Sequence, residues 1–218
     1  MSKIDIKILL VGSRDTGKNS LIHQYIYHKF NNNYYLSTIG LNFLFKAIKI
    51  DNQEVLLKIV DTTGQEKYRS LLSNCFRKVD GIILVFDITN KSSFEDIEEW
   101  LLVINRINRD IKKILVGNKI DLVNCREINK ENAEKYAERR NMKYFEVSDK
   151  TGENVEEAFS TLVRLILNSE KNINEKTNTK NKVGKKEFEI DNKTNNNHIN
   201  LNSDKDFKKN KLYKFLNI

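Results

Sequence analysis

Hydrophobic positions along residues 5–167 alternate between short aliphatic runs and helical spacings. The run Asp5–Val11 is aliphatic and β-branched and predicts a buried strand, whereas Lys18–Phe30 carries apolar residues at helical spacing. The remaining predicted elements, in chain order, are a hairpin of strands Asn42–Ile50 and Glu54–Val60, a helix after Gly64, strand Gly81–Asp87, helix Ser92–Arg109, strand Lys113–Gly117, helix Lys130–Arg140, strand Lys143–Val147 and helix Gly152–Leu167. This alternation predicts a doubly wound, mostly parallel α/β sheet.

The composition changes at Ser169, where the chain becomes rich in Asn and Lys and poor in aliphatic residues. Such a segment cannot bury enough apolar surface to offset the entropy of ordering it, so we expect one domain over residues 1–168 and a disordered tail over 169–218. Leu212, Phe215 and Leu216 lie at helical spacing among lysines. This end is either a basic amphipathic helix that contacts a membrane or a partner, or a solvated terminus.

The net charge of +8 lies mostly in the tail, which carries +5 and leaves +3 for residues 1–168. A nearly neutral domain argues against nucleic-acid binding. The two cysteines, Cys75 and Cys125, and the lack of a signal peptide favour a reducing, cytoplasmic compartment. No apolar stretch approaches the roughly 20 residues of a membrane span, and Ser2 does not allow myristoylation, so membrane contact is expected to be peripheral.

Gly12, Gly17 and Lys18 follow the first strand and open the first helix in the spacing of a phosphate-binding loop. Backbone N–H groups of this loop would surround a β-phosphate, and the Lys18 ammonium would bridge β- and γ-phosphate oxygens. The candidate phosphate-binding residues are Gly12, Arg14, Asp15, Thr16, Gly17, Lys18, Asn19 and Ser20.

Two further motifs follow predicted strands. Asn118-Lys119-Ile120-Asp121 selects guanine, because the Asp121 carboxylate can accept hydrogen bonds from both the N1 imino and the 2-amino group of that base. In the stretch Asp61–Gln65, the Asp61 carboxylate suits a water-mediated Mg²⁺ contact and the Gly64 N–H can meet a γ-phosphate. Gln65 could orient an attacking water.

With these motifs the chain resembles the Ras superfamily of small GTPases, and most closely its Rab family, over Lys3–Asn168. Three more stretches carry the likeness: Ser37–Phe43 resembles switch I, Asp80–Thr89 with Ser93, Phe94 and Trp100 resembles the central strand and the next helix, and Glu146–Lys150 resembles the last guanine-contact loop. The resemblance implies a P-loop NTPase fold, a small G domain with a six-stranded sheet and helices on both faces.

The resemblance also implies the ligands GTP or GDP with Mg²⁺, and further site residues. Thr38 would give its hydroxyl to Mg²⁺ and its N–H to the γ-phosphate, Phe30 or a neighbour would stack on guanine, and Lys119 would cover the opposite face of the base. Ser148, Asp149 and Lys150 would close the pocket. The implied catalytic set is Lys18, Thr38, Gly64 and Gln65, and the implied metal set is Asn19, Thr38 and Asp61.

Switch regions around Tyr35–Phe43 and Gly64–Leu72 would reorder with the γ-phosphate and present a changed surface to exchange factors, activators and effectors.

The phosphate loop departs from the family pattern at three positions. Asn19 replaces a hydroxyl residue that ligates Mg²⁺, and Mg²⁺ tolerates little departure from octahedral geometry. Ser20 cannot substitute, because one residue along a helix turns its side chain away. Arg14 and Asp15 stand where the family has small residues. We expect Arg14 to obstruct Gln65; the other interpretation is that it supplies a positive charge to the transition state. Asp15 is unfavourable near phosphates unless Arg14 or Lys18 neutralises it.

Other departures lie outside this loop. Val60 stands where Rab proteins carry tryptophan, and Thr63 and Asp149 stand where alanine is usual. The Asp149 carboxylate is expected to be tolerated if it points outward. The tail has no cysteine for prenylation.

Two functions follow. The first is a Rab-like switch in membrane traffic that binds and slowly hydrolyses GTP, with an impaired Mg²⁺ and γ-phosphate site. The alternative is a pseudo-GTPase that holds GDP or little nucleotide and sequesters an exchange factor or effector.

Overall fold

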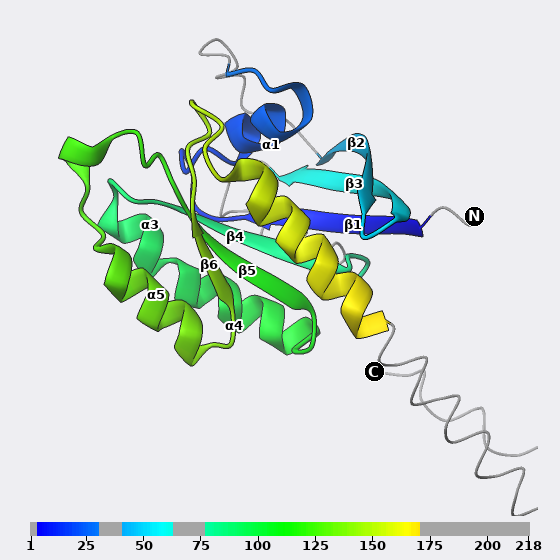
Figure 1. The fold of residues 1–218 in the computed structure, drawn as a ribbon. Helices are drawn as coiled ribbons and strands as arrows, with labels where there is room; N and C mark the ends of the chain where they lie inside the picture. The colour runs from blue at the N-terminus through cyan, green and yellow to red at the C-terminus, as the bar shows by residue number, and fades with distance from the viewer. Residues whose placement is uncertain (1–3, 31–40, 63–76, 171–218) are drawn as a thin grey trace, which may run out of the picture. The chain divides into compact units, whose positions relative to one another are not determined.

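A six-stranded sheet with helices on both faces forms the part of the chain that the structure describes (Figure 1). The structure is a computed structural model and describes residues 4–30, 41–62 and 77–170. Its strands are β1 (Ile4–Val11), β2 (Leu41–Ile50), β3 (Gln53–Thr62), β4 (Gly81–Asp87), β5 (Lys112–Asn118) and β6 (Lys143–Glu146). Its helices are α1 (Lys18–Tyr27), α3 (Lys91–Glu95), α4 (Ile97–Ile107), the short η2 (Val123–Cys125), α5 (Lys130–Arg139) and a last helix over residues 155–170.

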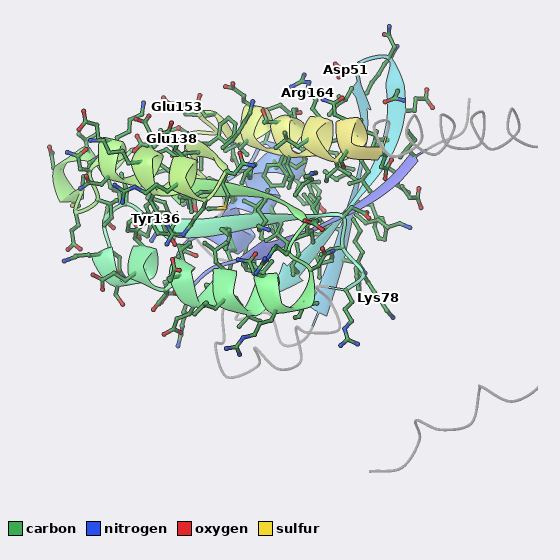
Figure 2. All side chains as sticks on the ribbon, turned by 90° about the horizontal axis from the view of Figure 1, so that it is seen from below. Asp51, Lys78, Tyr136, Glu138, Glu153 and Arg164 are labelled. Atoms are coloured by element: carbon green, nitrogen blue, oxygen red, sulfur yellow. The ribbon has the colours of Figure 1, made fainter. Side chains whose placement is uncertain are left out.

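The strands are ordered β2-β3-β1-β4-β5-β6, with β2 antiparallel to β3 and every other neighbouring pair parallel. This arrangement confirms the predicted doubly wound sheet. Asp51 and Asn52 join β2 to β3 with positive φ angles of 49° and 65°, which is the backbone of a two-residue type I′ turn. Arg164 of the last helix lies beside this turn, with its Nε 3.6 Å from Asp51 Oδ1 (Figure 2).

Two hydrophobic clusters cover the two faces of the sheet. On one face α1 and the last helix meet, and the Tyr25 and Phe159 rings stack with centroids 3.9 Å apart. On the other face α4 and α5 pack their buried residues, Trp100 and Ala133 among them, against Phe86 and its neighbours. Because helices cover both faces, every residue of β4 is buried, which explains its continuous apolar sequence.

The carboxyl ends of β1, β4 and β5 lie next to one another. Val11 pairs with Leu84 in the register of β1 and β4, and Asp87 pairs with Asn118 in that of β4 and β5. Since the first loop follows Val11, the sheet brings that loop close to the residues after Asn118. This edge is where ligands bind in open α/β sheets.

Four helices differ from their predicted bounds, since Lys130–Arg140 ends at Arg139, the last helix runs over residues 155–170 and not Gly152–Leu167, and two further helices end or divide early. The helix predicted to reach Phe30 ends at Tyr27, because His28 takes a left-handed conformation with φ of 52°. The predicted helix Ser92–Arg109 is divided into α3 and α4 at Asp96. The division is slight, since the Asp96 N–H still donates to Ser92 O and its carbonyl still accepts from Trp100 N. The helical spacing of apolar residues continues past both His28 and Asp96, so the sequence pattern could not show where the first helix ends or the second divides.

Several predictions fall outside the described residues. They concern the helix after Gly64, the site residues Thr38, Gly64 and Gln65, and the tail from residue 171 onward. Within the described residues, no helix combines the length and the apolar character needed to cross a membrane.

Candidate functional site

The loop between β1 and α1 requires glycine at both of its ends. Gly12 has φ of 151°, and a Cβ at this position would lie 2.0 Å from Val85 O. Gly17 has φ of 85°, and its Cβ would lie 2.2 Å from Asn118 Nδ2. The loop therefore rests directly on β4 and β5, and any larger residue would push it away from the sheet edge.

Lys18 is folded back into this loop and is only 5% exposed. Its Nζ donates to Gly12 O at 2.8 Å, to Ser13 O at 2.6 Å and to Thr16 Oγ1 at 3.3 Å. A buried ammonium is stable only with such partners. The positive charge is thus held inside the loop, where the oxygens of an anionic ligand would meet it together with the backbone N–H groups.

Ser13 connects the loop to the helical layer and was not among the predicted site residues. Its carbonyl accepts from Lys18 Nζ and, at 2.9 Å, from Thr16 Oγ1, while its own hydroxyl donates to Asp96 Oδ2 at 2.5 Å. Asp96 stands at the junction of α3 and α4, far from Ser13 in the sequence. No local pattern could have paired the two residues.

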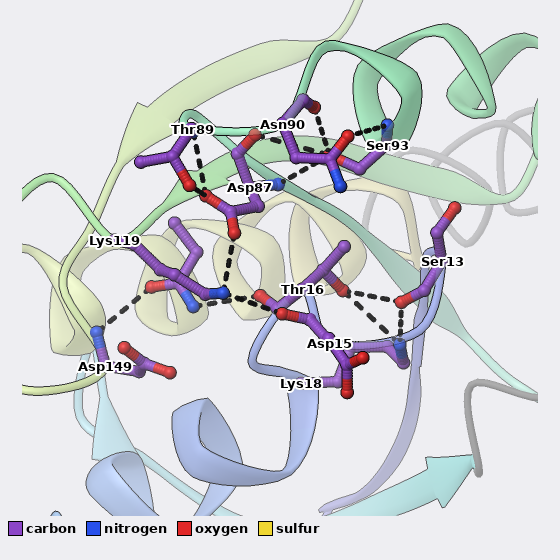
Figure 3. A network of polar contacts seen from close by, with 11 residues as sticks. Ser13, Asp15, Thr16, Lys18, Asp87, Thr89, Asn90, Ser93, Lys119 and Asp149 are labelled. Carbon is purple, nitrogen blue, oxygen red and sulfur yellow. Dashed lines mark hydrogen bonds and ion pairs between the residues drawn. The ribbon is translucent and has the colours of Figure 1, made fainter. Parts of the chain in front are cut away.

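The residues predicted to select the base contact one another and the loop, and Figure 3 shows two of them, Lys119 and Asp149, beside the loop. Asn118 is fully buried, donates from Nδ2 to Thr16 O at 3.0 Å and accepts from Asp149 N at 3.0 Å. Ser148 Oγ donates to Asp121 Oδ1 at 2.7 Å and accepts from Lys150 N at 3.2 Å. These bonds fix the Asp121 carboxylate, which can accept from the N1 and 2-amino groups of guanine.

Lys119 joins three segments of the site. Its Nζ lies 2.6 Å from Asp87 Oδ2 at the end of β4 and donates to Asp15 O at 2.8 Å in the loop. Asp87 also accepts from the N–H and the hydroxyl of Thr89. Sequence reasoning did not select Asp87, although a carboxylate at the carboxyl end of a buried parallel strand is the signal that could have found it.

The Asp149 side chain does not point outward, which was the condition under which its carboxylate was expected to be tolerated. The residue is 5% exposed, and its Oδ2 lies 2.4 Å from the place that a Cβ on Gly17 would occupy. Burial raises the pKa of its carboxyl above the usual value, against the opposing effect of a hydrogen bond from the Asn118 side chain. A carboxylate therefore points into the site between the loop and the base-selecting residues.

Arg14 and Asp15 lie at the exposed tip of the loop. Their side chains are each 77% exposed, with Arg14 Nε 3.6 Å from Asp15 Oδ2. Arg14, one of the two residues expected to neutralise Asp15, is thus the one that lies beside it. Asp15 has φ of 61°, a conformation that Asp tolerates better than most residues.

Asn19 offers one candidate metal ligand. Its Oδ1 is buried and has no hydrogen-bond partner among the described residues. A buried amide oxygen without a donor suits a hard cation such as Mg²⁺, which prefers oxygen ligands. Ser20 follows it in the first turn of α1. Asp61 lies in β3, but its side chain falls outside the described part, and no group of three or more His, Cys, Asp or Glu in that part could hold a metal.

Phe30, predicted to stack on the base, follows α1 and is 38% exposed. Among the described residues, Phe30 makes no hydrogen bond or ring contact with the base-selecting residues.

A cavity of about 850 Å³ lies elsewhere, where β5 and β6 begin, with Lys112 and Lys143 in its lining. Ligands of open α/β sheets bind at the carboxyl ends of the strands, so the loop edge, and not this cavity, is the candidate site.

Comparison with known proteins agrees with this geometry. Residues 7–168 match the Ras family. The Ras-related protein Rab-1 of Theileria annulata is 43% identical over 162 residues, which cover 73% of each chain. Rab-13 of Bos taurus is 40% identical over 162 residues, 74% of this chain and 79% of the relative. Rab-8B of Homo sapiens is 38% identical over 179 residues, 82% of this chain and 84% of the relative.

Proposed function

This chain belongs to the Ras family, within it to the Rab small GTPases, and from that premise we propose that it is a guanine-nucleotide switch with an impaired Mg²⁺ and γ-phosphate site. As a Rab-type protein it binds guanine nucleotide and acts in vesicle transport, with regulators and effectors as partners. Slow turnover of GTP and a preference for GDP are the proposed particulars.

The observation that carries the proposal is the unpartnered Asn19 Oδ1 directly after the loop lysine. Asn19 would hold Mg²⁺ with this oxygen, together with Thr38 and Asp61. Bound Mg²⁺ neutralises charge on the β- and γ-phosphates. An amide oxygen stands farther from the backbone than a hydroxyl, and Mg²⁺ demands near-ideal geometry. GTP should suffer more than GDP, since only GTP offers a γ-phosphate to the ion.

The exposed Arg14 supports slow hydrolysis. The loop tip carries two charged side chains where the family has small ones, and Arg14 already pairs with Asp15. A side chain of that length occupies space that Gln65 and an activator's arginine would need. We therefore expect obstruction to outweigh any charge that Arg14 gives to the transition state.

The affinities for GDP and GTP test the proposal directly. Nucleotide-freed protein is titrated with fluorescent GDP and GTP in millimolar Mg²⁺ and again in EDTA. We expect GDP to bind more tightly than GTP in Mg²⁺, and Asn19→Ser to raise GTP affinity by about tenfold in Mg²⁺ only. Asn132→Ser, an exposed position on α5, is the matched control. Equal affinities for both nucleotides, unchanged by Asn19→Ser, would refute the impaired site.

Hydrolysis is measured separately by single-turnover phosphate release from bound GTP. Slow release that rises in Arg14→Ser supports the switch. No release from the unmodified protein, even with candidate activators, favours the second function, a pseudo-GTPase that holds GDP or little nucleotide and sequesters an exchange factor. The clustering of Asn19, Arg14 and Asp15 in one loop is the feature that favours this alternative.

The strand next to switch I supplies a surface for such partners. Phe43 and Phe45 on β2 are 44% and 55% exposed, and Lys7 Nζ lies 5.1 Å from the Phe43 ring centroid. Val60, opposite Phe43 in the β2–β3 register, is fully buried. This apolar surface, with Lys7 beside Phe43, suits an effector or regulator. Because Val60 replaces tryptophan, the surface has less aromatic area than in Rab proteins that carry the tryptophan.

Peripheral contact with endomembranes through the basic C-terminal tail completes the proposal. Lys208, Lys209, Lys211 and Lys214 of the tail would provide attraction to anionic lipid. Co-sedimentation with anionic vesicles that is lost on deletion of residues 171–218 supports this, and unchanged co-sedimentation refutes it.

A further inference from the structure

Asp149 is a buried carboxylate that the nucleotide-binding role of its backbone does not require. Its N–H already serves the site by donating to Asn118 Oδ1 at 3.0 Å. Its side chain is turned toward Gly17 at the base of the phosphate loop and is shielded from water. Burying an ionised group at this position costs free energy, so the side chain is expected to affect the binding of any ligand in the pocket.

We propose that the Asp149 side chain weakens the hold of the pocket on guanine nucleotides and speeds their release, equally for GDP and GTP and independently of Mg²⁺. This inference rests on the proposed function, because it concerns the same pocket. It differs from the Asn19 effect, which requires Mg²⁺ and discriminates between the two nucleotides.

The first step of the argument is charge. Asp149 Oδ2 lies 2.4 Å from the position of a Gly17 Cβ, so it stands at the foot of the loop whose N–H groups and Lys18 are to hold phosphate. Nucleotide phosphates are polyanions, and repulsion between charges strengthens as solvent is excluded. A carboxylate here opposes the field that the loop provides.

Neighbouring charges do not cancel this carboxylate. Lys119 attracts it but is already held by Asp87 at 2.6 Å, and Asp121 repels it. Among the described residues, Asp149 forms no ion pair of its own. Lys18 in the loop is engaged with Gly12 O and Ser13 O.

The second step is competition for a donor. The Asn118 amide has two N–H groups, one of which donates to Thr16 O at 3.0 Å. The second N–H group lies beside the Asp149 carboxylate, because Asn118 Nδ2 and Asp149 Oδ2 are 2.2 Å and 2.4 Å from the same point, the place of a Gly17 Cβ. Guanine presents N7 and O6 as acceptors along one edge. A base entering the pocket must therefore compete with Asp149 for this N–H group, and alanine would not compete.

The experiment measures the release of fluorescent GDP chased with excess unlabelled GDP, in Mg²⁺ and in EDTA. Asp149→Ala removes both charge and acceptor, whereas Asp149→Asn removes the charge and retains an acceptor. Glu153→Gln is the matched control, since Glu153 lies on the same loop, carries the same charge and is exposed (Figure 2). Far-ultraviolet circular dichroism checks that each variant is folded.

We expect Asp149→Ala to slow GDP release by about tenfold in both conditions, because the substitution removes the repulsion between a buried unit charge and the phosphates. Asp149→Asn should fall between Asp149→Ala and the unmodified protein, and Glu153→Gln should change nothing. If the unmodified protein holds no measurable GDP, Asp149→Ala should create binding. The proposal is overturned if folded Asp149→Ala and Asp149→Asn release GDP as fast as the unmodified protein, or if the effect appears in Mg²⁺ alone.

The two proposals can fail separately. An effect of Asp149→Ala with no effect of Asn19→Ser refutes the impaired Mg²⁺ site and leaves the Asp149 inference intact. The reverse result refutes the Asp149 inference and leaves the proposed function in place.

Discussion

Lys119 Nζ lies 2.6 Å from Asp87 Oδ2, and this ion pair connects the base-selecting residues to the end of the central strand β4. Asp87 is 6% exposed, and Lys119 supplies the opposite charge beside it. Since Lys119 also donates to Asp15 O, the pair holds the phosphate loop and the base side of the pocket at a fixed separation. In the proposed function, this fixed separation would let the pocket bind base and phosphate together.

Breaking this pair should weaken both stability and binding. In Asp87→Asn the amide oxygen can still accept from Thr89, but Lys119 loses its counter-charge. We expect the free energy of unfolding to fall by about 3 kcal/mol, the usual cost of removing one partner from a buried pair, and GDP affinity to fall with it. Urea denaturation and GDP titration measure the two effects. Unchanged values in both would show that the pair contributes nothing.

The Ser13–Asp96 hydrogen bond should couple the phosphate loop to the α3–α4 junction. Ser13→Ala or Asp96→Ala should each lower the free energy of unfolding by about 1.5–3 kcal/mol, since the bond is charge-assisted. The double variant should cost much less than the sum, because both single changes remove the same bond. Additive losses in urea denaturation would mean that the two residues act independently.

Asp149 should make stability depend on pH. Burial raises the pKa of this carboxyl in the folded protein, so the folded state holds its proton more tightly than the unfolded chain does. Stability from this group is therefore present at acidic pH and is lost as pH rises through the folded pKa. Asp149→Asn should be more stable than the unmodified protein at pH 7.5, by a margin that shrinks on acidification. Urea midpoints of both proteins are compared at pH 7.5 and at an acidic pH, with Glu153→Gln as control. A stability difference that stays constant between the two pH values would contradict the prediction.

The Tyr25 hydroxyl should be dispensable. Its ring is stacked on Phe159 and covered by Lys46 Nζ 3.8 Å from the ring centroid, but its buried oxygen has no hydrogen-bond partner among the described residues. Tyr25→Phe should leave the packing intact and raise the free energy of unfolding by about 1 kcal/mol, since an unpaired polar group is removed. Tyr25→Ala should lower it by about 3–5 kcal/mol through the cavity left behind. A destabilised Tyr25→Phe variant would reveal a partner for the hydroxyl.

Sequence patterns predicted the sheet well because its elements have local signatures. The strands Gly81–Asp87 and Lys113–Gly117 are apolar runs, and the sheet buries them on both faces as such runs require. The loop Gly12–Lys18 and the motif Asn118–Asp121 were each predicted to follow a strand of this sheet, and in the structure Asn118 contacts Thr16 O. The ends of helices were predicted less accurately, since the spacing of apolar residues does not indicate that His28 takes a left-handed conformation.

The sequence by itself determined the order of strands and helices and predicted the phosphate loop and the guanine-selecting motif, because each of these depends on residue type at a fixed local spacing. Only the tertiary structure decided that Asp149 points at Gly17, that Asp87 holds Lys119 and that Ser13 reaches Asp96. These residues are far apart in the chain, and their contacts arise when parallel strands bring their carboxyl ends to one edge and the packed helices leave each side chain a single direction to take.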